Sequence, residues 1–182
     1  MTYFKHYSPC RIDVHVHLSG PDALYSIREA GVSAVRDAGT KDSAGLALQN
    51  ASSKLFIQSA GRALSRKGGY GGLFGKALET DAEIKEEIRT LKNAGAGIIK
   101  VMASGIVSLS EPGAITDGGF RAEQLAMIVS EARLLGLSVM AHANGEDAIM
   151  SAAEAGVRSI EHGFFMTERA LDELAKRGIW WV

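Results

Sequence analysis

The chain has 182 residues, 46% hydrophobic and 23% charged, with a formal net charge of -1. This composition is typical of one globular domain with a sizeable core. The balanced charge excludes the basic footprint of a nucleic-acid-binding protein or of a protein that binds an acidic membrane surface. No apolar run approaches the ~20 residues of a membrane span, the first ten residues lack the apolar core of a signal peptide, and the single cysteine, Cys10, cannot form an internal disulfide. We therefore expect a cytoplasmic protein.

Short apolar runs alternate with helical patterns along the whole chain. The patterns predict strands at 12–18, 33–37, 54–60, 97–103, 137–143, 158–163 and 179–182. They predict helices at 22–30, 43–50, 81–93, 121–135, 146–155 and 167–177. Two glycine-rich segments, 61–76 and 104–119, are predicted as loops, the first of them too flexible for a packed element. About seven strands that alternate with about six helices imply a parallel sheet with right-handed crossovers, and both a doubly wound sheet and a (β/α)8 barrel fit.

The first expected strand carries two histidines on one face. Its apolar residues alternate with Asp13, His15 and His17 in the run RIDVHVHL. A period of two places both imidazoles on the side opposite the apolar residues. The pattern predicts a buried strand, in which each imidazole needs a polar partner.

Three further polar residues fall on later expected strands. His142 and His162 stand near the ends of two strands, and Lys100 interrupts the apolar run GIIKVMA. Ligand sites of parallel α/β folds form at the carboxyl ends of strands. All three residues can therefore meet His15 and His17 at one centre. The fifth histidine, His6, lies in the N-terminal segment.

Each of these residues also has an ordinary structural interpretation. A strand histidine can be a hydrogen-bonded core residue, and Lys100 can be a surface lysine whose stem lies along the sheet. A buried Lys100 would instead have a lowered pKa and a nucleophilic amine. Asp13 is interpreted as a cap, while Asp37 at the end of the second strand could serve either a turn or the site. Neutral imidazoles without a clustered cysteine favour an open, catalytic Zn²⁺ site over a closed structural one.

With these motifs together, the sequence resembles the amidohydrolase superfamily of metal-dependent hydrolases. The matching pieces are IDVHVHL, IIKVMASG, VMAHANG and IEHG, in that order and over nearly the whole chain. The run VRDAG after the second strand is similar to the prolidase-like and imidazolonepropionase-like branch. The resemblance implies a (β/α)8 TIM-type barrel that hydrolyses amide, cyclic amide or peptide bonds in a small-molecule or dipeptide substrate.

The resemblance also implies a ligand set. His15 and His17 would bind the more buried metal, and His142 and His162 the second one. Lys100, carboxylated by CO₂, would bridge the two. A metal-bound hydroxide would attack the amide carbonyl, so Lys100, His142 and His162 are the expected catalytic residues.

Three departures from the superfamily pattern shape further expectations. Relatives carry an aspartate on an eighth strand and a small β-sandwich, whereas this sequence ends inside the seventh expected strand. Residues 1–182 are therefore expected to form an incomplete barrel domain, with IWWV (179–182) as an exposed apolar edge. A homo-oligomer or a missing C-terminal segment would complete it. Relatives also carry a histidine in a GGHG-like run, and here Tyr70 stands in that place.

Two other functions stay open. A Schiff-base lyase would use Lys100 as its nucleophile. A non-catalytic metal-binding or interaction module would keep the histidines without turnover.

Overall fold

The computed structural model describes residues 10–51 and 55–182, so His6 and the beginning of the strand predicted at 54–60 lie outside the described residues. The strands are β1 (Arg11–Val16), β2 (Val32–Asp37), β3 (Phe56–Ser59), β4 (Ala63–Arg66), β5 (Gly75–Leu78), β6 (Ile99–Met102), β7 (Val139–Ala143), β8 (Ser159–His162) and β9 (Trp180–Trp181). The helices are α1 (Pro21–Glu29), α2 (Ala44–Ala51), α3 (Asp81–Asn93), α4 (Ala122–Leu134), α5 (Glu146–Ala155) and α6 (Glu168–Arg177). None of these helices has the length and apolar character that crossing a membrane requires.

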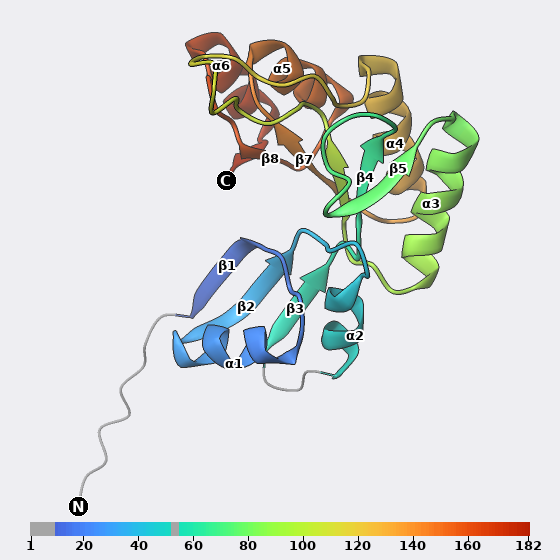
Figure 1. Ribbon diagram of the computed structural model, residues 1–182, viewed down its shortest axis with the longest axis vertical. Helices are drawn as coiled ribbons and strands as arrows, with labels where there is room; N and C mark the ends of the chain where they lie inside the picture. Colours follow the sequence, from blue (N-terminus) through green and yellow to red (C-terminus); the bar gives the residue numbers. More distant parts are fainter. Residues whose placement is uncertain (1–9, 52–54) are drawn as a thin grey trace, which may run out of the picture.

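The strands form two parallel sheets that are not joined into a closed barrel. One sheet has the order β1-β2-β3, and the other has the order β5-β4-β6-β7-β8-β9. Figure 1 shows the smaller sheet with α1 and α2 below the larger sheet and its helices. The α/β class with parallel strands is therefore confirmed, in the form of a partial barrel. Within the described residues β1 and β9 each pair on one side only.

The expectation that segment 61–76 holds no packed element is wrong, because β4 lies inside it and β5 begins within it. These two strands pair in parallel, with Ala63 opposite Gly75. A Cβ atom added to Gly75 would lie 1.9 Å from the Ala63 carbonyl oxygen. Glycine at this position therefore permits a close backbone approach and does not indicate flexibility.

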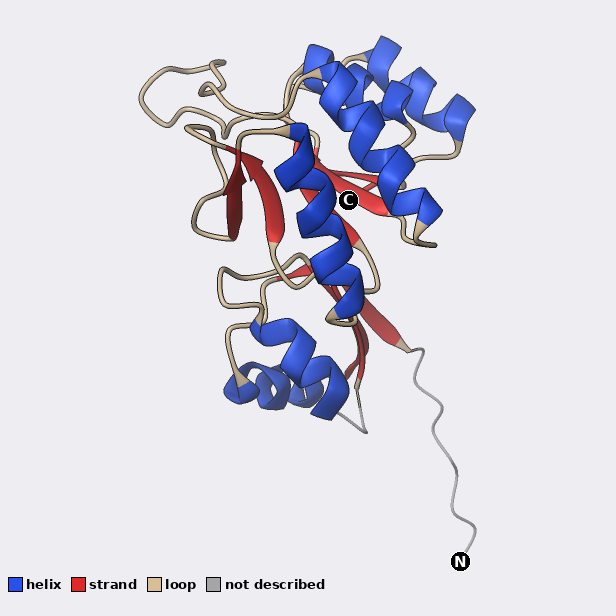
Figure 2. Cartoon of the chain, turned by 90° about the vertical axis from the view of Figure 1, so that its right-hand side faces the viewer, coloured by secondary structure: helices blue, strands red, loops and turns tan. Residues whose placement is uncertain are grey.

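Two apolar cores hold the helices against the sheets. The smaller core contains Leu18, Val35, Leu48, Leu55 and Ile57. The larger core lies between the six-stranded sheet and α3–α6. Helix α3 begins with a capping box between Thr80 and Glu83, which satisfies the free N–H groups of its first turn. It lies in front of the strands in Figure 2.

Helix α3 also links the two sheets. Gly61, between β3 and β4, lies against Leu91 of α3 and Leu46 of α2, since a Cβ atom added there would come within 3.0 Å of both side chains. The contact joins the helix of the larger sheet to a helix of the smaller one.

Strand β1 is less buried than the alternating pattern predicts. Ile12 and Val14 are 62% and 40% exposed, and only Leu18 beyond the strand's end is fully buried. The reason is that β1 is an edge strand with a neighbour on one side. At the opposite edge, Trp180 and Trp181 are 64% and 52% exposed, which confirms the expected apolar edge.

Candidate active site

Four imidazole rings converge at the carboxyl ends of β1, β7 and β8. The ring centroids of His15 and His17 lie 5.4 Å apart. His162 lies 4.9 Å from His15 and 5.0 Å from His142. Residues that are as many as 147 positions apart in sequence thus form one group, which we call the imidazole cluster (His15, His17, His142 and His162).

Lys100 in β6 belongs to the same centre. Its side chain is among the largest fully buried ones, and its Nζ has no hydrogen-bond partner within the described residues. Burial lowers the pKa of Lys100 from 10.5 to about 8, and the nearby guanidinium of Arg36 acts in the same direction against the opposing charge of Glu161. An unpartnered polar atom in the core is costly, so its position calls for a functional explanation.

His15 and His17 each have one ring nitrogen committed to an acceptor. His15 Nδ1 lies 2.6 Å from a Glu161 oxygen, and His17 Nδ1 lies 2.6 Å from the carbonyl oxygen of Gly39. A carbonyl oxygen can only accept, so Nδ1 of His17 carries the hydrogen and Nε2 keeps the lone pair. An ionised Glu161 can likewise only accept, so Nδ1 of His15 carries the hydrogen of their contact. Burial lowers the pKa of His17.

Burial holds His142 and His162 in the neutral form. Desolvation lowers the pKa of each to about 4, with the positive charge of Lys100 contributing. His142 Nε2 lies 2.9 Å from the carbonyl oxygen of Gly105, which leaves the lone pair on Nδ1. The His162 residue is exposed but its ring faces the other imidazoles, and its backbone is left-handed, with φ of 68°. Such a conformation is uncommon outside glycine.

Glu161 and Arg36 are site residues that the sequence analysis missed. Glu161 is fully buried and accepts hydrogen bonds from Arg36 Nη2 at 2.9 and 3.1 Å and from the Ser159 hydroxyl at 2.5 Å. Burial raises its pKa, but hydrogen bonds from His15 and Ser159 and the charges of Lys100 and Arg36 outweigh that effect, and the net pKa is lowered. The sequence does carry a signal for both residues. Each is a charged residue within a short apolar strand, which is the same pattern that pointed to Lys100.

Two aromatic side chains cover the imidazole cluster from the loop between β4 and β5. Phe74 stacks on His17 with ring centroids 4.4 Å apart, and Tyr70 lies 4.9 Å from His142. Tyr70 is partly buried, which raises its pKa. The segment thus excludes water from one side of the cluster.

The side chains of Asp13 and Asp37 accept hydrogen bonds from backbone N–H groups. Asp37 is fully buried and accepts from Leu18 N, Gly39 N and the Ser59 hydroxyl. It therefore fixes the turns after β1 and β2. Asp13 accepts from the backbone N–H of His15, in agreement with its expected capping role.

The chemistry of the cluster fits a divalent cation. Neutral imidazoles with a lone pair left on one nitrogen are the form that binds metal, and the unpartnered Lys100 Nζ lies beside them. Their donor atoms are nevertheless not gathered around a point: within residues 10–51 and 55–182 no group of three or more His, Cys, Asp or Glu side chains is arranged to hold a metal ion. The rings meet as neighbours, while their bonded nitrogens are directed at Glu161, Gly39 and Gly105.

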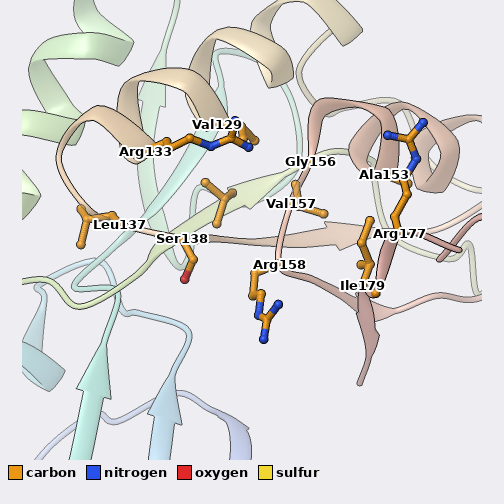
Figure 3. A pocket seen from close by; sticks show the side chains of 12 residues that line it. Val129, Arg133, Leu137, Ser138, Ala153, Gly156, Val157, Arg158, Arg177 and Ile179 are labelled. Atoms are coloured by element: carbon orange, nitrogen blue, oxygen red, sulfur yellow. The ribbon is translucent and has the colours of Figure 1, made fainter. Parts of the chain in front are cut away.

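A pocket lies at the opposite ends of the strands. It has a volume of about 460 Å³ and is lined by the segments that precede β7, β8 and β9. Figure 3 shows that Arg133, Arg158 and Arg177 extend in different directions there. In barrel enzymes the amino ends of the strands contribute to stability and the carboxyl ends to catalysis, so the imidazole cluster is the candidate active site.

Comparison with known proteins agrees with this arrangement of strands and side chains. The profile described as "Amidohydrolase family" matches residues 7–181. The chain belongs to the amidohydrolase family. Among curated relatives, ochratoxinase of Aspergillus niger is 30% identical over 151 residues, which cover 69% of this chain and 31% of that protein.

Solved structures support the prolidase-like branch. A prolidase complexed with N-methylphosphonate-L-proline superposes with a TM-score of 0.78 at 29% identity, covering 95% of this chain and 52% of that one. A Xaa-Pro dipeptidase with methionine bound in its active site has the same fold, with a TM-score of 0.83 at 23% identity and coverage of 96% and 52%. This chain thus spans about half the length of these structures and about a third of the curated relative.

Proposed function

We propose that this protein contributes the metal-binding half of a hydrolase that cleaves amide or peptide bonds. The observation that carries the proposal is the imidazole cluster around the buried, unpartnered Nζ of Lys100, at the carboxyl ends of the strands in a member of the amidohydrolase family. The prolidase relative, which is 29% identical and complexed with N-methylphosphonate-L-proline, favours a dipeptide as substrate.

The residues divide into ligands and supporting groups. His15, His17, His142 and His162 would hold one or two divalent cations, with Zn²⁺ the expected ion. Lys100, carboxylated on Nζ, would join them, because only a lysine with a lowered pKa has the free amine that reacts with CO₂. A divalent cation bound there supplies an activated water and polarises the substrate carbonyl. Glu161 would orient His15 through Nδ1, as carboxylates commonly orient metal-binding histidines.

Metal analysis and a hydrolysis assay test this proposal together. We expect the purified chain to retain Zn²⁺ or another divalent ion at a near-stoichiometric ratio, measured by elemental analysis after gel filtration. A panel of N-acyl amino acids and dipeptides should show amine release that chelation removes and the metal restores. Absence of bound metal, even after Zn²⁺ is offered, would contradict the proposal.

The same assays separate two other functions. Metal retention without hydrolysis would identify a non-catalytic metal-binding module. This alternative stays open because the chain covers only about half of each related structure. A Schiff-base lyase rests on the pKa of about 8 for Lys100. Borohydride would then trap a carbonyl substrate on Lys100, a reaction that hydrolysis does not predict.

We further propose that another polypeptide segment completes the partial barrel, from a second copy or from further sequence of the same protein. A pocket of about 550 Å³ lies between the two unpaired strand edges, lined by Val14 of β1 and by Trp180 and Trp181 of β9. Exposed edges and apolar side chains of this kind favour association. Sedimentation velocity over a dilution series should reveal a self-associating species. A monomer at every concentration would contradict association between copies.

A further inference from the structure

Asn144 is a buried amide beside the imidazole cluster. It follows the last residue of β7, two positions after His142, and is 3% exposed. Its Nδ2 lies 3.1 Å from the Nε2 of His142. A buried primary amide needs hydrogen-bond partners for both its nitrogen and its oxygen. Those partners show which parts of the site Asn144 holds.

The nitrogen of the Asn144 amide is bonded to the segment that follows β6. Nδ2 donates to the carbonyl oxygen of Gly105 at 3.3 Å, and Nε2 of His142 lies 2.9 Å from the same oxygen. The hydroxyl of Ser104 donates to this oxygen at 2.8 Å and accepts from the backbone N–H of Asn144 at 2.9 Å. Asn144 and Ser104 therefore hold the carbonyl group that fixes the tautomer of His142.

The oxygen of the same amide is bonded to the turn that follows β8. Oδ1 accepts from the backbone N–H of Phe164 at 3.1 Å, and the N–H of Gly145 donates to the carbonyl oxygen of Phe164 at 2.8 Å. A backbone N–H can only donate and the carbonyl of Gly105 can only accept, so the orientation of the amide is fixed. Asn144 thus connects the turn after β8 to the loop after β6.

The turn after β8 has a backbone that needs support. His162, Gly163 and Phe165 have left-handed φ angles of 68°, 61° and 60°. This conformation is unfavourable for residues that carry a Cβ atom. At one end of the turn, Trp181 Nε1 donates to the carbonyl oxygen of His162 at 3.0 Å. Asn144 holds the other end from β7, and the two contacts together fix the position of His162.

We propose that Asn144 is a positioning residue that sets the rings of His142 and His162 together as ligands of one metal ion. A single amide bonds the carbonyl group that orients His142 and the turn that carries His162. The two rings, whose centroids lie 5.0 Å apart, thereby keep one relative orientation. The role as ligands rests on the proposed hydrolase function, whereas the hydrogen bonds belong to the metal-free protein.

Two NMR measurements on the chelator-treated full chain test the two ends of the amide. In the wild-type protein the N–H of Phe164 should exchange slowly with solvent, and His142 should carry its hydrogen on Nε2 alone. Asn144→Leu removes both hydrogen-bonding ends at similar volume. It should accelerate exchange at Phe164 by at least about tenfold, and His142 should become a mixture of both tautomers because its acceptor is released. Asn144→Ala removes the same bonds with less crowding and should change both signals in the same direction.

Zn²⁺ affinity supplies a third measurement, by competition with a chromophoric chelator. Asn144→Leu should lower it by about 10- to 100-fold, the usual effect of losing a group that orients metal ligands. The matched control is Gln49→Leu. Gln49 is also an amide that bridges two backbone groups, since it donates to the carbonyl oxygen of Gly95 at 2.9 Å and accepts from the N–H of Ser59 at 2.8 Å. It lies in α2, so all three measurements should stay as in the wild type.

Unchanged exchange at Phe164, a single His142 tautomer or an unchanged Zn²⁺ affinity in the Asn144 variants would each overturn the proposal. Equal losses in Gln49→Leu would overturn it as well, because they would show general destabilisation. A wild-type chain that binds no Zn²⁺ would contradict the hydrolase proposal. The exchange and tautomer measurements need no metal, so they would still decide whether Asn144 positions the two rings.

Discussion

Replacing Lys100 with methionine is expected to stabilise the chelated protein while it abolishes stable metal retention. Lys100 is 1% exposed, and burial moves its pKa from 10.5 to about 8. That difference corresponds to about 3 kcal/mol of folding free energy at pH 7. Methionine of similar length fills the same space without a charge. Urea unfolding at pH 7 measures the gain, and elemental analysis measures the metal.

The pH dependence provides an independent check of Lys100. Its pKa in the folded protein is lower than in the unfolded chain, so the unfolded chain binds more protons between about pH 8 and 10.5. The stability of the wild-type chelated protein should therefore rise through this window relative to Lys100→Met. Lys92→Met, at an exposed position, serves as the control. A stability difference that does not change with pH would show that Lys100 is neither buried nor perturbed.

Replacing Glu161 with glutamine is expected to weaken both the fold and the metal site. The change removes the ionised acceptor of His15 and leaves the guanidinium of Arg36, whose side chain is only 14% exposed, without its charge partner. Breaking a buried ion pair in this way costs about 3 kcal/mol. Loss of the carboxylate behind a metal-binding histidine lowers metal affinity by about 10- to 100-fold. Urea unfolding and competition with a chromophoric chelator measure the two effects.

Two further variants test whether Glu161 positions the His15 ring or only stabilises the fold. Arg36→Met combined with Glu161→Gln should recover part of the stability, because the unpaired charge of Arg36 is removed. It should not recover the metal affinity, because His15 still lacks its carboxylate partner. Glu131→Gln removes a carboxylate that pairs with Lys85 and Arg89 between α3 and α4, away from the site, and should cost less than about 1 kcal/mol. Unchanged metal affinity in Glu161→Gln would refute a positioning role. NMR of the His15 ring nitrogens reports the tautomer directly.

Local patterns in the sequence determined most of the helices and the strand ends. The helices predicted at 81–93 and 146–155 have the same bounds in the structure. Amphipathic spacing, an N-cap threonine and a glycine at the helix end are local signals, because each depends on residues within about one turn. The polar residues on apolar strands were also visible, since a period of two places His15 and His17 on one face whatever the fold. These signals depend only on neighbours along the chain.

The tertiary structure alone decided what those residues contact. The carboxylate of Glu161 and the guanidinium of Arg36 meet because β2 and β8 lie across the partial barrel, and no spacing within either strand encodes that pairing. The same holds for β4 and β5, because Gly75 is required by the backbone of the neighbouring strand, whereas the glycine-rich sequence around it predicts a flexible loop. The exposure of Ile12 and Val14 likewise depends on which strand lies beside β1. Pairing across the sheet, burial and charge partners are properties of the packed molecule, and they set the pKa of Lys100 and the tautomer of His15.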